Sequence, residues 1–186
     1  MYLRWSIPFS MQTQELIPEI HRLCLAREDK ERAKKFQYYF KHTVDAYGLT
    51  SPQVNEIVKE ILKRNQLLPK TVFEALYYFF EQGKYEEISC CLLLLDNLHK
   101  QFTKATFHAF SAIFEKGIDN WAHADTLAMF IFPKFIKKGI VTPEEFLPWL
   151  KAKNKFQRRC VAVSYIKAVK QNKAKKCNPT SIMCCH

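Results

Sequence analysis

Glycine is scarce in this chain, and so is any long apolar run. Only 4 of the 186 residues are Gly, whereas 15 are Phe and 8 are Tyr. Few glycines and many large side chains favour packed helices with short turns over a sheet with many hairpins. The most apolar stretch, residues 90–95, ends at Asp96, far short of the roughly 20 residues that a membrane-spanning helix needs. We therefore expect an all-α globular protein without a membrane span.

Cysteine pairs with metal-ligand spacing are also missing. The seven cysteines include no C-x-x-C pair, and four lie among apolar neighbours: Cys24, Cys90, Cys91 and Cys160. This pattern is typical of buried free thiols in a reducing compartment. We expect no cofactor, no metal and a cytoplasmic location, associated with the nucleoid if the source is bacterial. A metal site in the tail is the alternative, with the ligands Cys177, Cys184, Cys185 and His186.

Positive charge is concentrated in one part of the chain. Residues 134–176 hold 13 Lys and Arg against two acids, a net charge of 13 − 2 = +11, which equals the net charge of the whole chain. A polyanion such as DNA or RNA is the natural partner for such a block. The alternative is a solvated lysine-rich face without a partner.

Apolar residues recur with helical spacing along most of the chain. Punctuation residues mark the ends: Thr50 and Pro52 begin one helix, Pro69 and Gly83 bound the next, and Gly117 ends another. Further helices are expected over residues 85–98, 121–138 (with Gly139 as its stop) and 156–169. Thr142 opens a short helix with a capping-box pattern.

The glycine stops at Gly83 and Gly117 lie 34 residues apart, and each interval holds two helices. A period of roughly 30 to 45 residues per helix pair indicates an α-solenoid. We predict a right-handed solenoid of HEAT-like helix pairs over residues 11–172, with a plain helical bundle as the alternative. Residues 1–10 are too short and interrupted for a secretion signal and form an extension, with Met1 or Met11 as the start. Residues 173–186 lack an apolar period and form a loose tail.

Three segments in order resemble the AlkD-type DNA alkylation repair glycosylases. They are YYFK (38–41) with YGLTSP (47–52), then NWAHAD (120–125), then FQRRCVAV (156–163). The resemblance covers residues 11 to 170. It implies stacked helix pairs with a concave basic surface, and excision of purines alkylated at N3 or N7 without a deep flipping pocket. Members usually continue with further helix pairs, so it also implies a shortened C-terminus and three possibilities: an active enzyme, a binding remnant or a truncated product.

The resemblance places the family's tryptophan at Trp121, its catalytic aspartate at Asp125 and its arginine at Arg159, with Tyr39 at a DNA-facing position. Trp121 and Asp125 are four residues apart, so they share one helix face. An alkylated purine is a cationic leaving group, and a carboxylate stabilises the positive charge that develops on the sugar and can orient a water molecule. A tryptophan face favours a cation nearby. Arg159 fits either a phosphate or Asp125.

Duplex DNA containing alkylated purines is the expected partner of a monomer. Phosphate contacts that read no sequence are expected from four basic residues: Lys151, Lys153, Lys155 and Arg158.

Structural alternatives remain open for each site residue. Trp121 can be a core residue, Asp125 a first-turn carboxylate that favours the helix dipole, and the two arginines ordinary surface charges. His123 is expected to face away from Asp125. Two other function classes also remain: a non-catalytic nucleic-acid-binding module, and a helical scaffold whose basic face binds an acidic protein.

Overall fold

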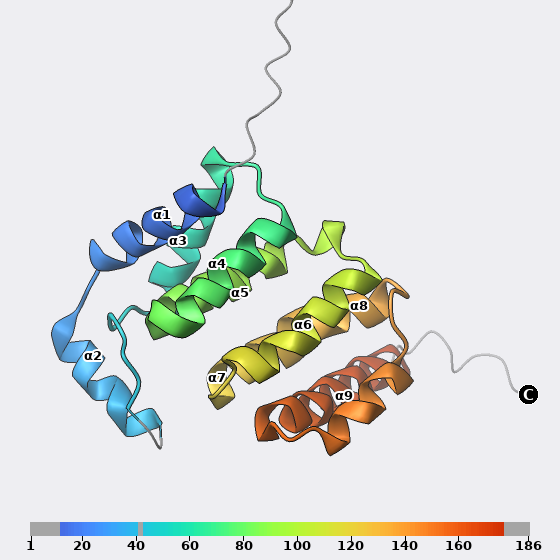
Figure 1. Cartoon of the computed structure of the whole chain (residues 1–186). Coiled ribbons are helices and arrows are strands. Elements are labelled where there is room, and N and C mark those ends of the chain that lie inside the picture. Colours follow the sequence, from blue (N-terminus) through green and yellow to red (C-terminus); the bar gives the residue numbers. More distant parts are fainter. Residues whose placement is uncertain (1–11, 41–42, 177–186) are drawn as a thin grey trace, which may run out of the picture.

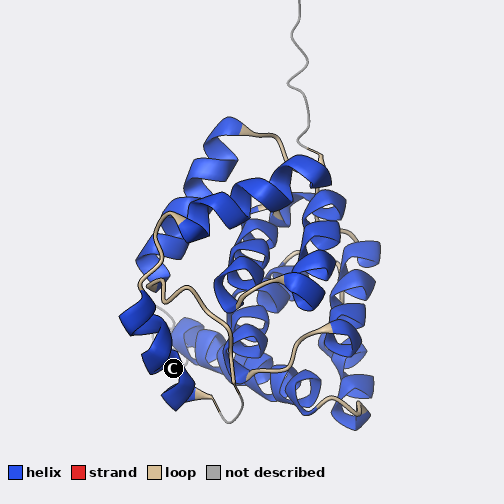
Figure 2. Cartoon of the chain, turned by 60° about the vertical axis from the view of Figure 1, so that its left-hand side comes forward, coloured by secondary structure: helices blue, strands red, loops and turns tan. Residues whose placement is uncertain are grey.

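The protein was analysed as a computed structural model that describes residues 12–40 and 43–176 (Figure 1). Within these ranges the chain forms helices and loops only, as Figure 2 shows, so the predicted all-α class is confirmed. The α-helices and the short 3-10 or π elements (η) follow in this order: α1 (Thr13–Leu25), α2 (Lys30–Phe36), η1 (Gln37–Tyr39), α3 (Ser51–Arg64), α4 (Pro69–Gln82), α5 (Tyr85–Asn97), η2 (His99–Gln101), α6 (Lys104–Lys116), α7 (Trp121–Thr126), η3 (Leu127–Ile131), α8 (Phe132–Lys137), η4 (Pro143–Lys151) and α9 (Lys155–Lys176).

The helices form two layers. In one layer α1 packs on α4, and α4 packs on α6. In the other, α3 packs on α5, α5 contacts α7, and α7 packs on α9. The two layers pack on each other, since α1 contacts α3 and α4 contacts α5, while α7 and α8 lie behind α6 (Figure 1). The helix pairs thus follow one another along the molecule. This arrangement confirms the predicted α-solenoid of helix pairs.

Most helix boundaries follow the local chemistry of the sequence. The Thr50 side chain accepts a hydrogen bond from the Gln53 N–H, and Pro52 lies in the first turn of α3. Helix α4 begins at Pro69 and gives way to Gly83, as predicted. Gly139 adopts φ +65°, where Gly is favoured, and the N–H groups of Gly139 and Ile140 close a Schellman motif on Ile136 and Phe135.

Aromatic side chains dominate the core of the second half. Phe107 stacks on Trp149 with ring centroids 5.2 Å apart, and Phe102 stacks on Phe135 at 4.5 Å. Edge-to-face contacts with Phe110 and other rings join these two stacks. Each buried aromatic removes a large apolar area from water and adds about 0.5–1.5 kcal/mol per ring pair. These contacts hold η4 and α8 against α6.

Two predicted helices differ from the structure. The expected continuous helix over residues 121–138 is interrupted by the π segment η3, directly before α8. Pro133 explains the π segment, because it has no N–H to donate and its ring would clash with the carbonyl of residue 129 in a regular α-helix. The last helix, expected to end near residue 169, runs to Lys176 and so extends into the segment predicted as a loose tail.

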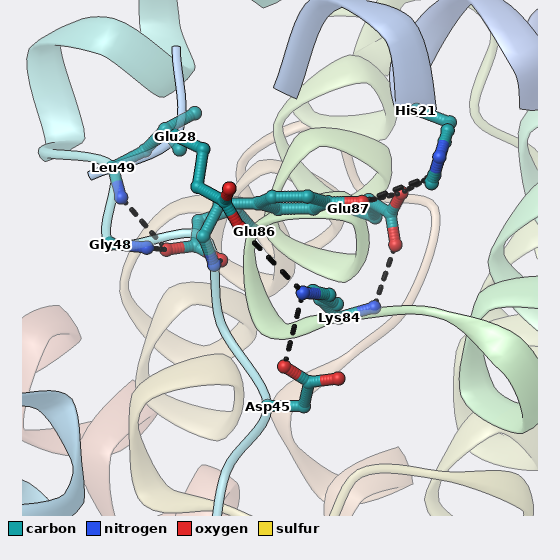
Figure 3. Close-up of polar contacts among 9 residues, drawn as sticks. His21, Glu28, Asp45, Gly48, Leu49, Lys84, Glu86 and Glu87 are labelled. Carbon is teal, nitrogen blue, oxygen red and sulfur yellow. Dashed lines mark hydrogen bonds and ion pairs between the residues drawn. The ribbon is translucent and has the colours of Figure 1, made fainter. Parts of the chain in front are cut away.

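Residues 43–50 form a loop without helix or turn, and a buried acid anchors its second half (Figure 3). Glu86 on α5 is fully buried and accepts hydrogen bonds from the backbone N–H groups of Tyr47, Gly48 and Leu49 at 2.8 to 2.9 Å. Gly48 has φ +78°, and a Cβ there would lie 2.3 Å from the Asp29 carbonyl oxygen. Glycine is therefore required at this position.

A second acid extends the same network. The Glu87 carboxylate accepts bonds from the Tyr47 hydroxyl at 2.9 Å and the Lys84 N–H at 2.6 Å, and contacts His21 Nδ1 at 2.9 Å (Figure 3). Burial is the main cause that raises the pKa of Tyr47 well above its ordinary value, and the hydrogen bond to the Glu87 carboxylate raises it further. The loop over residues 45–49 is thereby fixed to α5.

Candidate active site

Asp125 on α7 and Arg159 on α9 form a bidentate ion pair that joins the two helices. Arg159 Nε donates to Asp125 Oδ1 at 2.7 Å, and a terminal guanidinium nitrogen donates to Oδ2 at 2.8 Å. The Asp125 side chain is 20% exposed and that of Arg159 is 46% exposed. The hydrogen bond to Asp125 raises the pKa of Arg159 above its usual value. The Asp125 carboxylate is therefore held in a fixed orientation and is partly exposed between the two helices.

Trp121 lies one turn before Asp125 on α7, and it remains 45% exposed. Its indole Nε1–H donates to the Tyr39 carbonyl oxygen at 3.3 Å, and its ring stacks on Phe40 with centroids 5.9 Å apart. Tyr39 itself is exposed. The structure thus brings Tyr39, Trp121, Asp125 and Arg159 to one region, although 120 positions separate the first from the last. Trp121 is not a core residue.

His123 occupies the opposite, buried side of α7. It is 2% exposed, and its Nδ1 lies 2.8 Å from Asn120 Nδ2. Its Nε2 contacts Ser89 Oγ at 3.0 Å and the Tyr85 carbonyl at 3.2 Å. Burial lowers the pKa of His123 to about 4. Its ring nitrogens are engaged in these buried contacts, so it is not placed to act as a base at Asp125.

Asn120 fixes the beginning of α7. Its Oδ1 accepts a hydrogen bond from the His123 backbone N–H at 2.9 Å, which is a typical N-cap contact. Asp125 lies beyond the first turn of α7, so the helix dipole does not account for its position.

The basic residues predicted to bind DNA surround the loop between η4 and α9. Lys151, Lys153 and Lys155 are all exposed. Arg158 is exposed too, but one of its guanidinium nitrogens donates to the carbonyl oxygens of Ala152 and Lys153, so this side chain also closes the loop. Lys155 Nζ also lies 4.9 Å from the centroid of the Phe156 ring. As exposed cations, the three lysines can bind a polyanion.

A comparison with known families decides what kind of protein this is. A family model described as DNA alkylation repair enzyme matches residues 23–182, well over half of the chain. The chain belongs to the DNA alkylation repair enzyme family. Searches of curated proteins and of solved structures returned no match.

Membership of the DNA alkylation repair enzyme family makes DNA the substrate class and agrees with the resemblance drawn from the three sequence segments. The region around Trp121, Asp125 and Arg159 is the candidate active site of this family member. In this region Asp125 is partly exposed and lies one helical turn after the exposed Trp121 on α7.

Residues 12–40 and 43–176 contain no group of three or more His, Cys, Asp or Glu side chains arranged to hold a metal ion. Cys24, Cys90, Cys91 and Cys160 are buried free thiols, as predicted. The alternative metal ligands in the tail (Cys177, Cys184, Cys185, His186) lie outside the described residues.

No helix in the described ranges is long and apolar enough to cross a membrane.

Phe40 is the site residue that sequence reasoning missed. Its ring lies between Trp121 and Tyr85, with centroid distances of 5.9 and 5.6 Å. The sequence places it 81 positions before Trp121, and its apolar character alone predicts only a core residue. The Asn120 cap was also missed, although a cap-type residue directly before Trp121 was a usable signal.

Proposed function

We propose that this family member is a DNA glycosylase that hydrolyses the N-glycosidic bond of purines alkylated at N3 or N7. The observation that carries the proposal is the bidentate Asp125–Arg159 pair, partly exposed and one helical turn from the exposed Trp121.

The substrate chemistry suits a single carboxylate. When the C1′–N bond breaks, its electron pair goes to the cationic purine, which leaves as a neutral base. The deoxyribose is left with oxocarbenium character, and a water molecule adds to C1′ and loses a proton. A nearby carboxylate stabilises the developing positive charge. No general acid is needed, because the leaving base is already cationic.

Asp125 has the capacity for this role while it is paired. Each carboxylate oxygen can accept about two hydrogen bonds, and Arg159 occupies one position on each. One acceptor position per oxygen is left for a water molecule or for the sugar. Arg159 acts by orienting the carboxylate, which is the second of the two roles considered from the sequence.

Trp121 supplies an aromatic surface beside that carboxylate. An indole face attracts a cation by about 0.5–2 kcal/mol, depending on desolvation. A cationic alkylpurine, or its positively charged sugar, gains from this contact and an unmodified neutral purine does not. Trp121 therefore favours damaged nucleotides over normal ones.

The basic residues before and at the start of α9 bind the duplex in this proposal. Lys151, Lys153, Lys155 and Arg158 contact phosphates without reading sequence, and exposed Tyr39 contacts the DNA near Trp121. The protein acts as a monomer without a cofactor. The four cysteines among the described residues are buried and free, which suits a reducing, cytoplasmic environment.

The test is release of 7-methylguanine or 3-methyladenine from methylated duplex DNA. We expect release by the wild-type protein and by Glu115→Gln, which removes one exposed carboxylate on α6. Asp125→Asn removes the same charge at the site and is expected to abolish most release. If the wild-type protein releases no more base than Asp125→Asn, the glycosylase proposal is wrong.

The second candidate is a non-catalytic DNA-binding module, favoured by the three exposed lysines around the η4–α9 loop. It predicts duplex binding that weakens steeply with salt and no base release from any substrate. Measured release that depends on Asp125 excludes it.

A further inference from the structure

Trp121 is exposed but held on one side by two residues from a distant part of the chain. Phe40 stacks on the indole with an interplanar angle of 26°, and the Tyr39 carbonyl accepts the indole N–H. The indole N–H is therefore already used in a contact within the protein. An exposed aromatic side chain without such contacts samples several rotamers, so these two contacts narrow its orientation.

Phe40 is itself held by α5. Its ring packs against Tyr85 at 5.6 Å between centroids, and Phe36 contacts the same Tyr85 ring at 5.4 Å. Tyr85 is the first residue of α5, and its N–H donates to the Asp45 carbonyl oxygen at 2.9 Å. The ring that supports Trp121 thus rests on the beginning of a central helix.

The chain of contacts then returns to α7. Tyr85 stacks on His123 with centroids 4.6 Å apart and an interplanar angle of 16°. His123 lies two residues after Trp121 and is fixed by Asn120 and Ser89. We call the four rings Trp121, Phe40, Tyr85 and His123 the aromatic circuit. It begins and ends on α7 and passes through two other parts of the chain.

We propose that Phe40 is a positioning residue, which sets the indole orientation of Trp121 through the aromatic circuit and leaves one indole face for the cationic nucleotide. This inference rests on the proposed function, because it assigns the open face a ligand. Phe40 covers one face of the ring, and the carbonyl of Tyr39 occupies its N–H edge. The remaining face, on the exposed side of the indole, is the surface for a cation–π contact.

The variant Phe40→Leu distinguishes a role in orienting the Trp121 indole from a general contribution to apolar packing. Phe40→Leu keeps an apolar side chain of similar reach but has no planar ring to stack on the indole. Phe40→Tyr keeps the ring and serves as the rescue variant. Tyr78→Leu removes an exposed aromatic residue from α4, in the other layer, and is the matched control.

The first readout is independent of activity. The protein contains three Trp residues, so 5-fluorotryptophan labelling gives three fluorine NMR signals, and Trp121→Phe identifies the one from Trp121. We expect Phe40→Leu to shift or broaden that signal, while Phe40→Tyr and Tyr78→Leu leave it near the wild-type position. An unchanged Trp121 signal in Phe40→Leu overturns the inference.

The second readout is single-turnover base release from methylated DNA. Small misplacements of a positioned group cost about tenfold or more in rate, so we expect Phe40→Leu to release base about tenfold more slowly. Its duplex affinity should stay within about twofold, because Phe40 contributes no charge to phosphate binding. Phe40→Tyr should recover most of the rate.

The two proposals fail in different ways. If the wild-type protein releases base and Phe40→Leu matches its rate, the positioning role is wrong and the glycosylase proposal stands. If the wild-type protein releases none, the glycosylase proposal is wrong. In that case the Trp121 signal in Phe40→Leu still decides whether the aromatic circuit orients the indole.

Discussion

Replacing Glu86 by Gln tests whether one buried carboxylate fixes the loop over residues 45–49 to α5. Glu86 Oε1 accepts the N–H groups of Gly48 and Leu49, and Oε2 accepts that of Tyr47. Gln has only one acceptor oxygen. If that oxygen keeps Gly48 and Leu49, its NH₂ group points at the Tyr47 N–H, and two donors face each other in a buried site.

Two opposing contributions set the change in the free energy of unfolding. Hydrogen bonds to a charged group contribute about 1.5–3 kcal/mol each, and a buried donor left unsatisfied costs about 1–3 kcal/mol. Against this, burial raises the pKa of Glu86, while its backbone hydrogen bonds lower it. The carboxylate is thus already costly to bury, which offsets part of the loss. We expect a net destabilisation of about 2–4 kcal/mol.

Urea and thermal denaturation measure this directly. For a protein of this length, about 3 kcal/mol corresponds to a fall in Tm of roughly 6–12 °C. Glu28→Gln is the matched control, since Glu28 lies in the same region, 4.0 Å from Lys84, and is partly exposed (Figure 3). Its loss should cost less than about 1 kcal/mol. Equal stabilities of the Glu86 and Glu28 variants would refute the reasoning.

Three further predictions follow from the site. Arg159→Lys loses the bidentate contact with Asp125, so base release should slow by about 10- to 100-fold while urea stability falls by less than about 1 kcal/mol. Because the pKa of His123 is lowered to about 4 in the folded state, the unfolded chain binds its proton first as the pH falls from 6.5. Urea denaturation at pH 7 and 4.5 should show a loss of roughly 2–3 kcal/mol from this group. Joint replacement of Lys151, Lys153 and Lys155 by Ala should make the plot of log K against log salt less steep by up to about 2.7 for duplex binding.

Each of these predictions has a matched control. Lysine removal is compared with Ala replacements at three exposed lysines elsewhere, Lys59, Lys70 and Lys100; an equal change of the salt slope in that variant would contradict a dedicated binding surface. His123→Gln should flatten the acid loss, and an unaltered profile would show that other groups cause it. An Arg159→Lys protein as fast as the wild type would show that the fork of the guanidinium is not needed.

Boundaries set by local chemistry could be predicted from the sequence. Each of these boundaries depends on a few neighbouring residues. Helices begin at the Thr50 cap and at the ring of Pro69, and they end at the Gly83 C-cap and at Gly139, which has a positive φ. The π segment before α8 was missed, although Pro133 was visible, because the apolar period continues on both sides of it. An apolar stripe alone therefore does not distinguish a continuous helix from one with a π segment.

The candidate site could be predicted only where its residues lie close together in the sequence. Trp121 and Asp125 share a face because they are four apart on one helix. The Arg159–Asp125 pair crosses 34 positions, and the sequence left phosphate and Asp125 as equal partners. The support of Trp121 by Phe40 depends on tertiary packing. Glu86 and Glu87 were also unforeseen, since two acids beside an apolar run are expected to face water, and here both are buried.

The most direct test of the account is the single-turnover rate of 7-methylguanine release by the wild-type protein and by Asp125→Asn at saturating protein. Asn keeps the shape of the side chain and its place one turn after Trp121, but it removes the charge to which the proposed mechanism assigns the stabilisation of the sugar cation. The account predicts a loss of at least about 100-fold with unchanged duplex binding. Equal rates for the two proteins would contradict the central role given to the Asp125 carboxylate.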